Sequence, residues 1–104
     1  MRHAGFITLF RGLLQTALVA VFLLVSACET SPPVQEMSDA RQAIAAAKEA
    51  GAAEKAAFHL KAAEDYLDSA EKALNDRDYS EARYDARQAK MKALDALKAS
   101  EDSE

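Results

Sequence analysis

The chain has 104 residues, with 13 Lys and Arg against 17 Asp and Glu, and this length allows one small domain at most. All 17 acids lie in residues 28–104, and this acidic balance excludes a protein that binds polyanions through its bulk charge. The same part has no Trp and few large apolar residues, which excludes the core of a large enzyme.

Residues 1–27 contain no acid and are typical of a secretory signal peptide. Two arginines and a histidine within residues 1–11 precede an apolar run over residues 12–25, and small residues then lead up to Ala27. Positive, apolar and small segments in this order form the signal-peptide pattern. The apolar run is shorter than the roughly 20 residues of a comfortable spanning helix. The alternative interpretation is an N-terminal membrane helix that is not cleaved.

The residues Val25-Ser26-Ala27-Cys28 resemble the lipobox of bacterial lipoproteins. The resemblance implies cleavage between Ala27 and Cys28 and a diacylglycerol on the Cys28 thiol, so the partner of this segment is a membrane. A single cysteine in an exported chain cannot form an internal disulfide, which fits this role. An incidental cysteine in a membrane helix is the alternative. Glu29 replaces the aspartate that, by resemblance to the enterobacterial sorting rule, retains lipoproteins in the inner membrane. We therefore expect a lipid anchor in the bacterial cell envelope, with the outer membrane favoured and the domain facing the periplasm.

Residues 28–32 are predicted to be the lipidated N-terminus and a tether, because two prolines interrupt any ordinary helix there. Residues 33–100 form an alanine-rich domain with one glycine, and strong helix formers dominate it. Residues 101–104 are expected to fray.

Apolar residues with alternating three- and four-residue spacing predict three helices, at about residues 33–50, 53–75 and 78–100. Gly51 suits the end of the first helix, and Asp78 with Glu81 has the spacing of a capping box at the start of the third. The three stripes are Met37, Ala40, Ile44, Ala47 and Gly51; Ala53, Ala56, Leu60, Ala63, Leu67, Ala70 and Leu74; and Tyr79, Ala82, Ala86, Ala89, Ala93 and Ala96.

The second and third helices are predicted to form an antiparallel hairpin. In that register Glu71 faces Arg83 and Glu64 faces Lys90, and such flanking charges select the orientation of paired helices. The predicted fold is all-α: a short three-helix bundle built on an antiparallel helical hairpin and preceded by a signal peptide.

Four large apolar residues lie off the predicted stripes and form a possible partner surface: Phe58, Tyr84, Met91 and Leu94. We favour the interpretation that the helix at 33–50 covers them. The alternative is that they face another protein.

The segment from Leu74 to Ala82 resembles the turn of a tetratricopeptide-type hairpin, where a polar turn leads into Asp-Tyr-x-x-Ala. The pattern from Ser38 through Gly51 to Asp78-Tyr79 resembles small bacterial lipoproteins whose alanine-rich helical domain is a domain of unknown function. The resemblance covers roughly residues 33–98 and implies a fold and a location but no activity. A single hairpin also falls short of a repeat array, which usually needs three or more units.

No catalytic, cofactor-binding or metal-binding constellation is visible in the sequence. The residues three and four positions from His59 are alanines and a lysine, so the helical metal-ligand spacings are empty. We therefore expect no enzyme activity, no cofactor, no small-molecule substrate and no nucleic acid. The expected function is a lipid-anchored structural or interaction protein that binds an envelope partner or itself. The alternative is a peptide- or protein-binding adaptor or chaperone-like accessory of a larger envelope complex.

Overall fold

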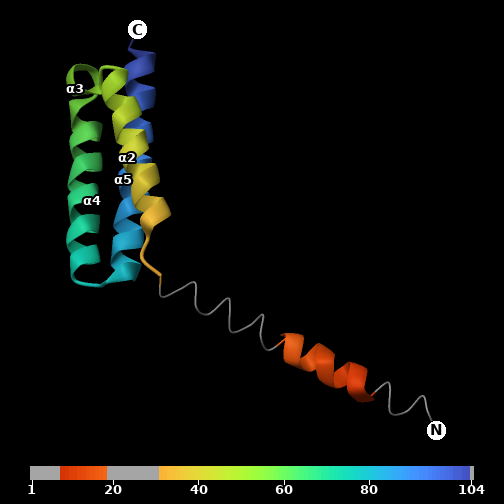
Figure 1. Cartoon of the computed structure of the whole chain (residues 1–104). Helices are drawn as coiled ribbons and strands as arrows, with labels where there is room; N and C mark the ends of the chain where they lie inside the picture. Colours follow the sequence, from red (N-terminus) through yellow and green to blue (C-terminus); the bar gives the residue numbers. More distant parts are fainter. Residues whose placement is uncertain (1–7, 19–30, 104) are drawn as a thin grey trace. The chain divides into compact units, whose positions relative to one another are not determined.

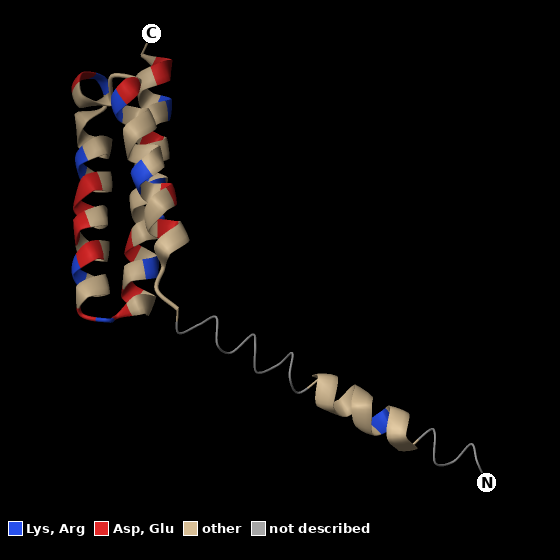
Figure 2. Ribbon diagram, in the orientation of Figure 1, with Lys and Arg blue, Asp and Glu red and all other residues tan. Residues whose placement is uncertain are grey.

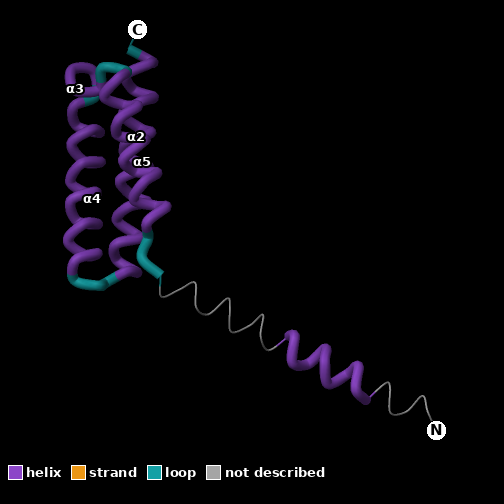
Figure 3. Tube along the Cα trace, in the orientation of Figure 1, coloured by secondary structure: helices purple, strands orange, loops and turns teal. Residues whose placement is uncertain are grey.

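The structure, a computed structural model, describes residues 8–18 and 31–103. The chain divides into two compact units, Met1–Ser31 and Pro32–Glu104, and each is described by itself. The described residues contain helices and no strand, which confirms the all-α class (Figure 3). In the N-terminal unit, residues 8–18 are helical. The signal peptide itself remains a prediction, because Ala27 and Cys28 lie outside the described residues.

The second unit consists of the helices α2 (Val34–Glu49), α3 (Ala52–Lys55), α4 (Ala57–Asn75) and α5 (Tyr79–Asp102). The long helices α2, α4 and α5 lie side by side (Figure 1). Helices α4 and α5 run antiparallel through a turn at residues 76–78, as the sequence predicts. Helix α2 lies along both of them.

The first helix ends as predicted, at a left-handed glycine. Gly51 has a φ of 85°, and its N–H donates to the carbonyl oxygen of Lys48 at 3.0 Å. This conformation is the usual one for the residue after a helix C-cap. The continuous helix expected at 53–75 is wrong in its first turn, because Ala56 has a φ of −146° and separates α3 from α4. The break buries Ala52 in place of Ala53.

The third helix begins as predicted and ends later. The Asp78 carboxylate accepts a hydrogen bond from the Glu81 N–H at 3.2 Å, which caps the start of α5. The helix continues through Glu101 and Asp102, which were expected to fray. Ser100 is fully buried just before them, so packing holds the last turn in place.

The core of the second unit is made mostly of alanine. Five of the six residues of the predicted α5 stripe are completely buried, and Tyr79 is half-buried. One core cluster gathers around Leu60 and Ile44, and a second gathers around Met37. Leu67 packs against both clusters and joins them. Alanine on both sides lets helix axes approach to the short end of roughly 8–10 Å.

The turn between α4 and α5 contains a strained residue, which gives a first testable prediction. Arg77 has a φ of 61°, and the Asp78 N–H donates to the Ala73 carbonyl oxygen at 2.9 Å, as in a Schellman motif. A left-handed conformation costs a residue with a Cβ about 1–2 kcal/mol. Arg77→Gly should therefore raise the free energy of unfolding by about 0.5–1.5 kcal/mol, measured by urea unfolding of the full chain in non-ionic detergent. A decrease would mean that the Arg77 side chain makes a larger contribution than the backbone strain.

Candidate interaction surface

The four residues of the possible partner surface are exposed. Phe58 is 83% exposed, Tyr84 57%, Met91 58% and Leu94 46%. The interpretation that the first helix covers them is therefore wrong, because α2 instead occupies the groove that the buried alanines of α4 and α5 form.

The four residues belong to two separate exposed patches. Tyr84, Met91 and Leu94 lie seven and three residues apart along α5, on the face opposite its buried alanine stripe. Phe58 lies on α4, beside a shallow hollow that Ala57, Lys61, Ala62 and Asp65 also line. All residues lining that hollow belong to α4. The apolar stripe of α5 is therefore the larger candidate interaction surface in the second unit.

His59 is half-buried, and its ring meets the Phe58 ring edge-on, with centroids 5.7 Å apart. Within residues 8–18 and 31–103, no group of three His, Cys, Asp or Glu side chains is placed to hold a metal ion. Among the same residues, no helix is both long enough and apolar enough to cross a membrane.

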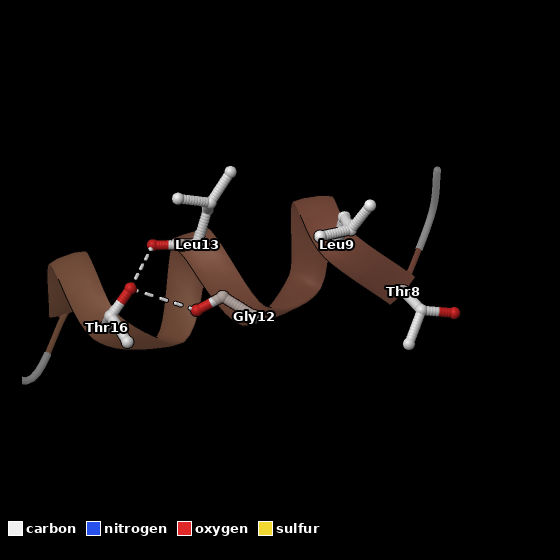
Figure 4. A pocket seen from close by; sticks show the side chains of 5 residues that line it. All are labelled: Thr8, Leu9, Gly12, Leu13 and Thr16. Atoms are coloured by element: carbon white, nitrogen blue, oxygen red, sulfur yellow. Dashed lines mark hydrogen bonds between the residues drawn. The ribbon is translucent and has the colours of Figure 1, made fainter. Parts of the chain in front are cut away.

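The N-terminal unit carries a hollow of its own, shown in Figure 4. It lies along one helix, because Gly12 has no side chain between Leu9 and Leu13 on one side and two threonines on the other. The Thr16 hydroxyl donates to the carbonyl oxygens of Gly12 and Leu13, at 3.0 and 2.9 Å, so its hydrogen bonds stay within its own helix. The hollow has walls from a single helix, so we assign no ligand to it.

Ion pairs flank the contact between α2 and the hairpin on two edges, and α2 carries bases on one edge and acids on the other. On one edge, Arg41 of α2 pairs with Glu71 of α4 at 3.2 Å, and Lys48 pairs with Glu64 at 3.4 Å. On the other edge, α2 presents acids to the bases of α5. These pairs are Glu36–Arg83 at 3.2 Å, Glu36–Arg87 at 3.8 Å and Asp39–Lys90 at 4.0 Å. Figure 2 shows charges of both signs along the helices.

The ion pairs differ from the charge pairs that were expected across the hairpin. Glu71 and Glu64 were predicted to face Arg83 and Lys90, but all four have partners in α2. Helix α2 lies between the charged edges of α4 and α5, and its own charged side chains pair with both. The signal was present in the sequence, because Arg41 and Lys48 are seven residues apart like the glutamates they meet.

Asp85 belongs to no motif of the sequence, yet its side chain is only 6% exposed on α5. Burial, and secondly the charge of Asp78, raise the pKa of its carboxyl above the ordinary 3.8. An acid whose pKa is raised by folding stabilises the folded state below its unfolded pKa, and this contribution is lost as the pH rises through the folded pKa.

Asp85→Asn should therefore leave the chain at least as stable as the wild type near neutral pH. On acidification, the wild type should gain stability relative to the variant. Urea unfolding of the full chain in non-ionic detergent at several pH values measures this difference. Asp95→Asn is the matched control, because Asp95 is exposed on the same helix. A wild-type advantage that grows towards neutral pH would show that the carboxylate of Asp85 is stabilised in the fold.

No curated protein and no solved structure matches this chain at a significant level. Residues 35–104 match the family described as Domain of unknown function (DUF4398). The match begins at the start of α2 and takes in all of α3, α4 and α5. It confirms the predicted resemblance to a family defined by a domain of unknown function. Because it covers more than half of the chain, the chain belongs to the DUF4398 family.

Proposed function

We propose that this chain is a lipid-anchored protein of the bacterial cell envelope, with a structural or interaction role in the periplasm and no catalysis. In this proposal residues 1–27 are a signal peptide, Cys28 carries the lipid, and a short three-helix bundle built on an antiparallel hairpin follows. The outer membrane is the favoured location. The order of positive, apolar and small residues before Cys28 supports the anchor.

The observation that carries the interaction role is the exposed apolar stripe of α5. Isolated exposed apolar residues are ordinary, but Tyr84, Met91 and Leu94 line one face of one helix. Aromatic and methionine side chains, such as those of Tyr84 and Met91, are enriched where proteins contact one another. A lipid anchor would hold this face close to other envelope proteins.

The anchor is tested by Cys28→Ala. We expect the wild type to incorporate labelled palmitate and the variant to accumulate as an unlipidated precursor, because the chain has 1 Cys. Equal incorporation of label into the two chains would overturn the anchor.

The interaction role is tested by photo-crosslinking in living cells, with a photoreactive residue in place of Met91 and mass spectrometry of the products. The control places the same residue at Ala45, which is exposed on α2. A defined product from Met91 and none from Ala45 is expected. Identical products from both positions would mean that the α5 stripe selects no partner.

The alternative function is a peptide- or protein-binding adaptor or chaperone-like accessory of an envelope complex. The exposure of all four residues of the predicted surface favours it over a purely structural role. An adaptor would give crosslinks from Phe58 as well as from Met91. The structural or interaction role would give crosslinks from Met91 and none from Phe58.

A further inference from the structure

Among residues 8–18 and 31–103, Asp85 is the one charged side chain that is buried, and its carboxylate forms no hydrogen bond or ion pair with any of them. Burial and the charge of Asp78 both raise the pKa of this carboxyl, so neither favours a negative charge there. In the same part of the chain, no side-chain oxygen is both sealed from solvent and without a hydrogen bond. The oxygens of Asp85 therefore keep a narrow opening to the surface.

Asp85 lies on the side of the hairpin that α2 does not occupy. On α5, Arg83 and Lys90 pair with α2. With about 100° of rotation per residue, Asp85 lies about 160° around the helix from Arg83 and about 140° from Lys90. On α4, Glu64 and Glu71 pair with α2, so the opposite flank of that helix is also turned away from it. The two flanks that face away from α2 form one surface, called here the rear face.

The rear face follows the helical spacing of three and four residues on both helices. Its members are Ala62, Tyr66, Ser69 and Ala73 of α4, and Glu81, Asp85, Gln88, Lys92 and Asp95 of α5. Ala70 and Ala86 share one core cluster, so Ser69 and Asp85, which precede them, lie at the same level of the hairpin. The short helix α3 packs with the other cluster, around Leu60, and of the helices in the second unit none lies across the rear face at the level of Asp85.

The charge of the rear face indicates what it would bind. Glu81, Asp85 and Asp95 stand against the single base Lys92. A buried charge without a partner is costly, and perturbed acids of this kind gather at functional sites. A ligand that brings a positive charge to Asp85 would remove that cost. The same acidity disfavours an anionic lipid surface.

The shape of the ligand is indicated by α2 on the opposite face. There a helix packs its apolar side on the alanines of the same hairpin and sets its charges against those of α4 and α5. The rear face offers small side chains along α4 in the same way, with Ala73 buried and Ala62 half-buried. A second copy of this chain has few bases to offer, because five of the seven in α2 and α5 already form ion pairs within the chain.

We propose that the rear face binds a basic amphipathic helix of another envelope protein, and that a Lys or Arg of that helix pairs with Asp85. Tyr84 and Met91 precede Gln88 and Asp95 by four residues, so they border the rear face and would meet the same helix. The inference rests on the proposed interaction role and names the chemistry of the partner. It does not depend on the lipid at Cys28.

The first experiment places a benzophenone side chain at Ser69 of α4 and, in a separate full-length chain, at Tyr84 of α5. Both positions are exposed, and they lie on the two helices beside Asp85. After photo-crosslinking in living cells, mass spectrometry should find the same peptide of another protein linked to both positions. That peptide should contain a Lys or Arg within apolar residues of three- and four-residue spacing.

A product that is a second copy of this chain, a lipid or a peptide without a base would overturn the proposal, and so would the lack of any product from Ser69. A protein partner linked from Tyr84 and Met91 but not from Ser69 would overturn binding at the rear face and leave the proposed interaction role intact. None of these outcomes affects palmitate labelling of Cys28.

The ion pair is tested with a fluorescent synthetic peptide that has the sequence of the crosslinked segment. Its Kd for the full chain in non-ionic detergent is measured by fluorescence anisotropy. Asp85→Asn should raise the Kd at least about ten-fold, because it removes one partner of a desolvated charge pair. Asp95→Asn, at an exposed position of the same face, should raise it less than about three-fold.

A change in the peptide completes a double-mutant cycle. Replacing its basic residue by Gln should weaken binding to the wild type about as much as Asp85→Asn does, and should change binding to the Asp85→Asn chain little. Equal effects of the two aspartate substitutions, or additive effects of Asp85→Asn and the peptide change, would overturn the ion pair.

Urea unfolding separates a loss of binding from a loss of folding. Asp85→Asn should bind more weakly while remaining at least as stable as the wild type near neutral pH, because the free fold gives the carboxylate no partner. A variant that is both less stable and weaker in binding would show that the carboxylate serves the fold itself, and the proposal would be overturned.

Discussion

Leu67→Ala is expected to lower the free energy of unfolding by about 2–3 kcal/mol. Leu67 is half-buried, yet it is the residue that packs against both core clusters, the one around Leu60 and the one around Met37. Its neighbours there are mostly alanines, which cannot move into the space that a leucine leaves. The cavity should therefore stay open, and the cost should include the lost packing as well as the lost burial.

The measurement is urea unfolding of the full chain in non-ionic detergent, followed by far-ultraviolet circular dichroism. Leu94→Ala is the matched control, because it makes the same chemical change at a residue that is 46% exposed on α5. It should change the free energy of unfolding by no more than about 0.5 kcal/mol. Equal effects of the two substitutions would mean that the two core clusters do not depend on Leu67.

The helices were predictable because composition and spacing agree with each other along most of the chain. Glu49, Asn75 and Tyr79 bound helices within one residue of their predicted limits. At each of these places the signal is local: a glycine that permits a left-handed backbone, a polar turn, and an aspartate that caps a helix. Local signals of this kind do not depend on what packs against the helix.

The break at Ala56 was not predictable from its residue type. Alanine is the strongest helix former, and the residues around it favour a continuous helix. The break places Ala52 and Ala56 in the core, at 0% and 7% exposure, where the short helix α3 contacts α5. Tertiary packing thus overrides propensity at this position, and a single sequence carries no sign of it.

The charge pairing was predicted with the correct residues and the wrong partners. Glu64, Glu71, Arg83 and Lys90 all take part in ion pairs between helices, as expected for charges that flank a seam. The error lay in treating the hairpin as if α2 were absent. Once a third helix occupies the groove, the nearest opposite charge for each edge lies on that helix. The expectation that α2 covers the four exposed apolar residues failed for a different reason, because α2 packs on the buried alanines of the hairpin instead.

Ala93→Leu is expected to destabilise the chain by about 1–3 kcal/mol, although leucine is the more apolar residue and nearly as good a helix former. Ala93 is completely buried in the cluster that contains Ile44 and Leu60. Close approach of the helices leaves no room for a leucine there. To accept it, α5 must move away from its neighbours, and the alanines that pack along the whole length of the helix then lose contact.

Ala45→Leu is the control, because it adds the same atoms to an exposed position on α2. It should leave the midpoint of urea unfolding nearly unchanged, while Ala93→Leu should lower it. Leu67→Ala and Ala93→Leu together distinguish a core that contains unfilled space from one that is closely packed. If Leu67→Ala destabilises and Ala93→Leu stabilises, the helices lie farther apart than the alanine seam requires and the core has unfilled space. If both destabilise, the alanines of α5 are what hold the helices at their observed spacing.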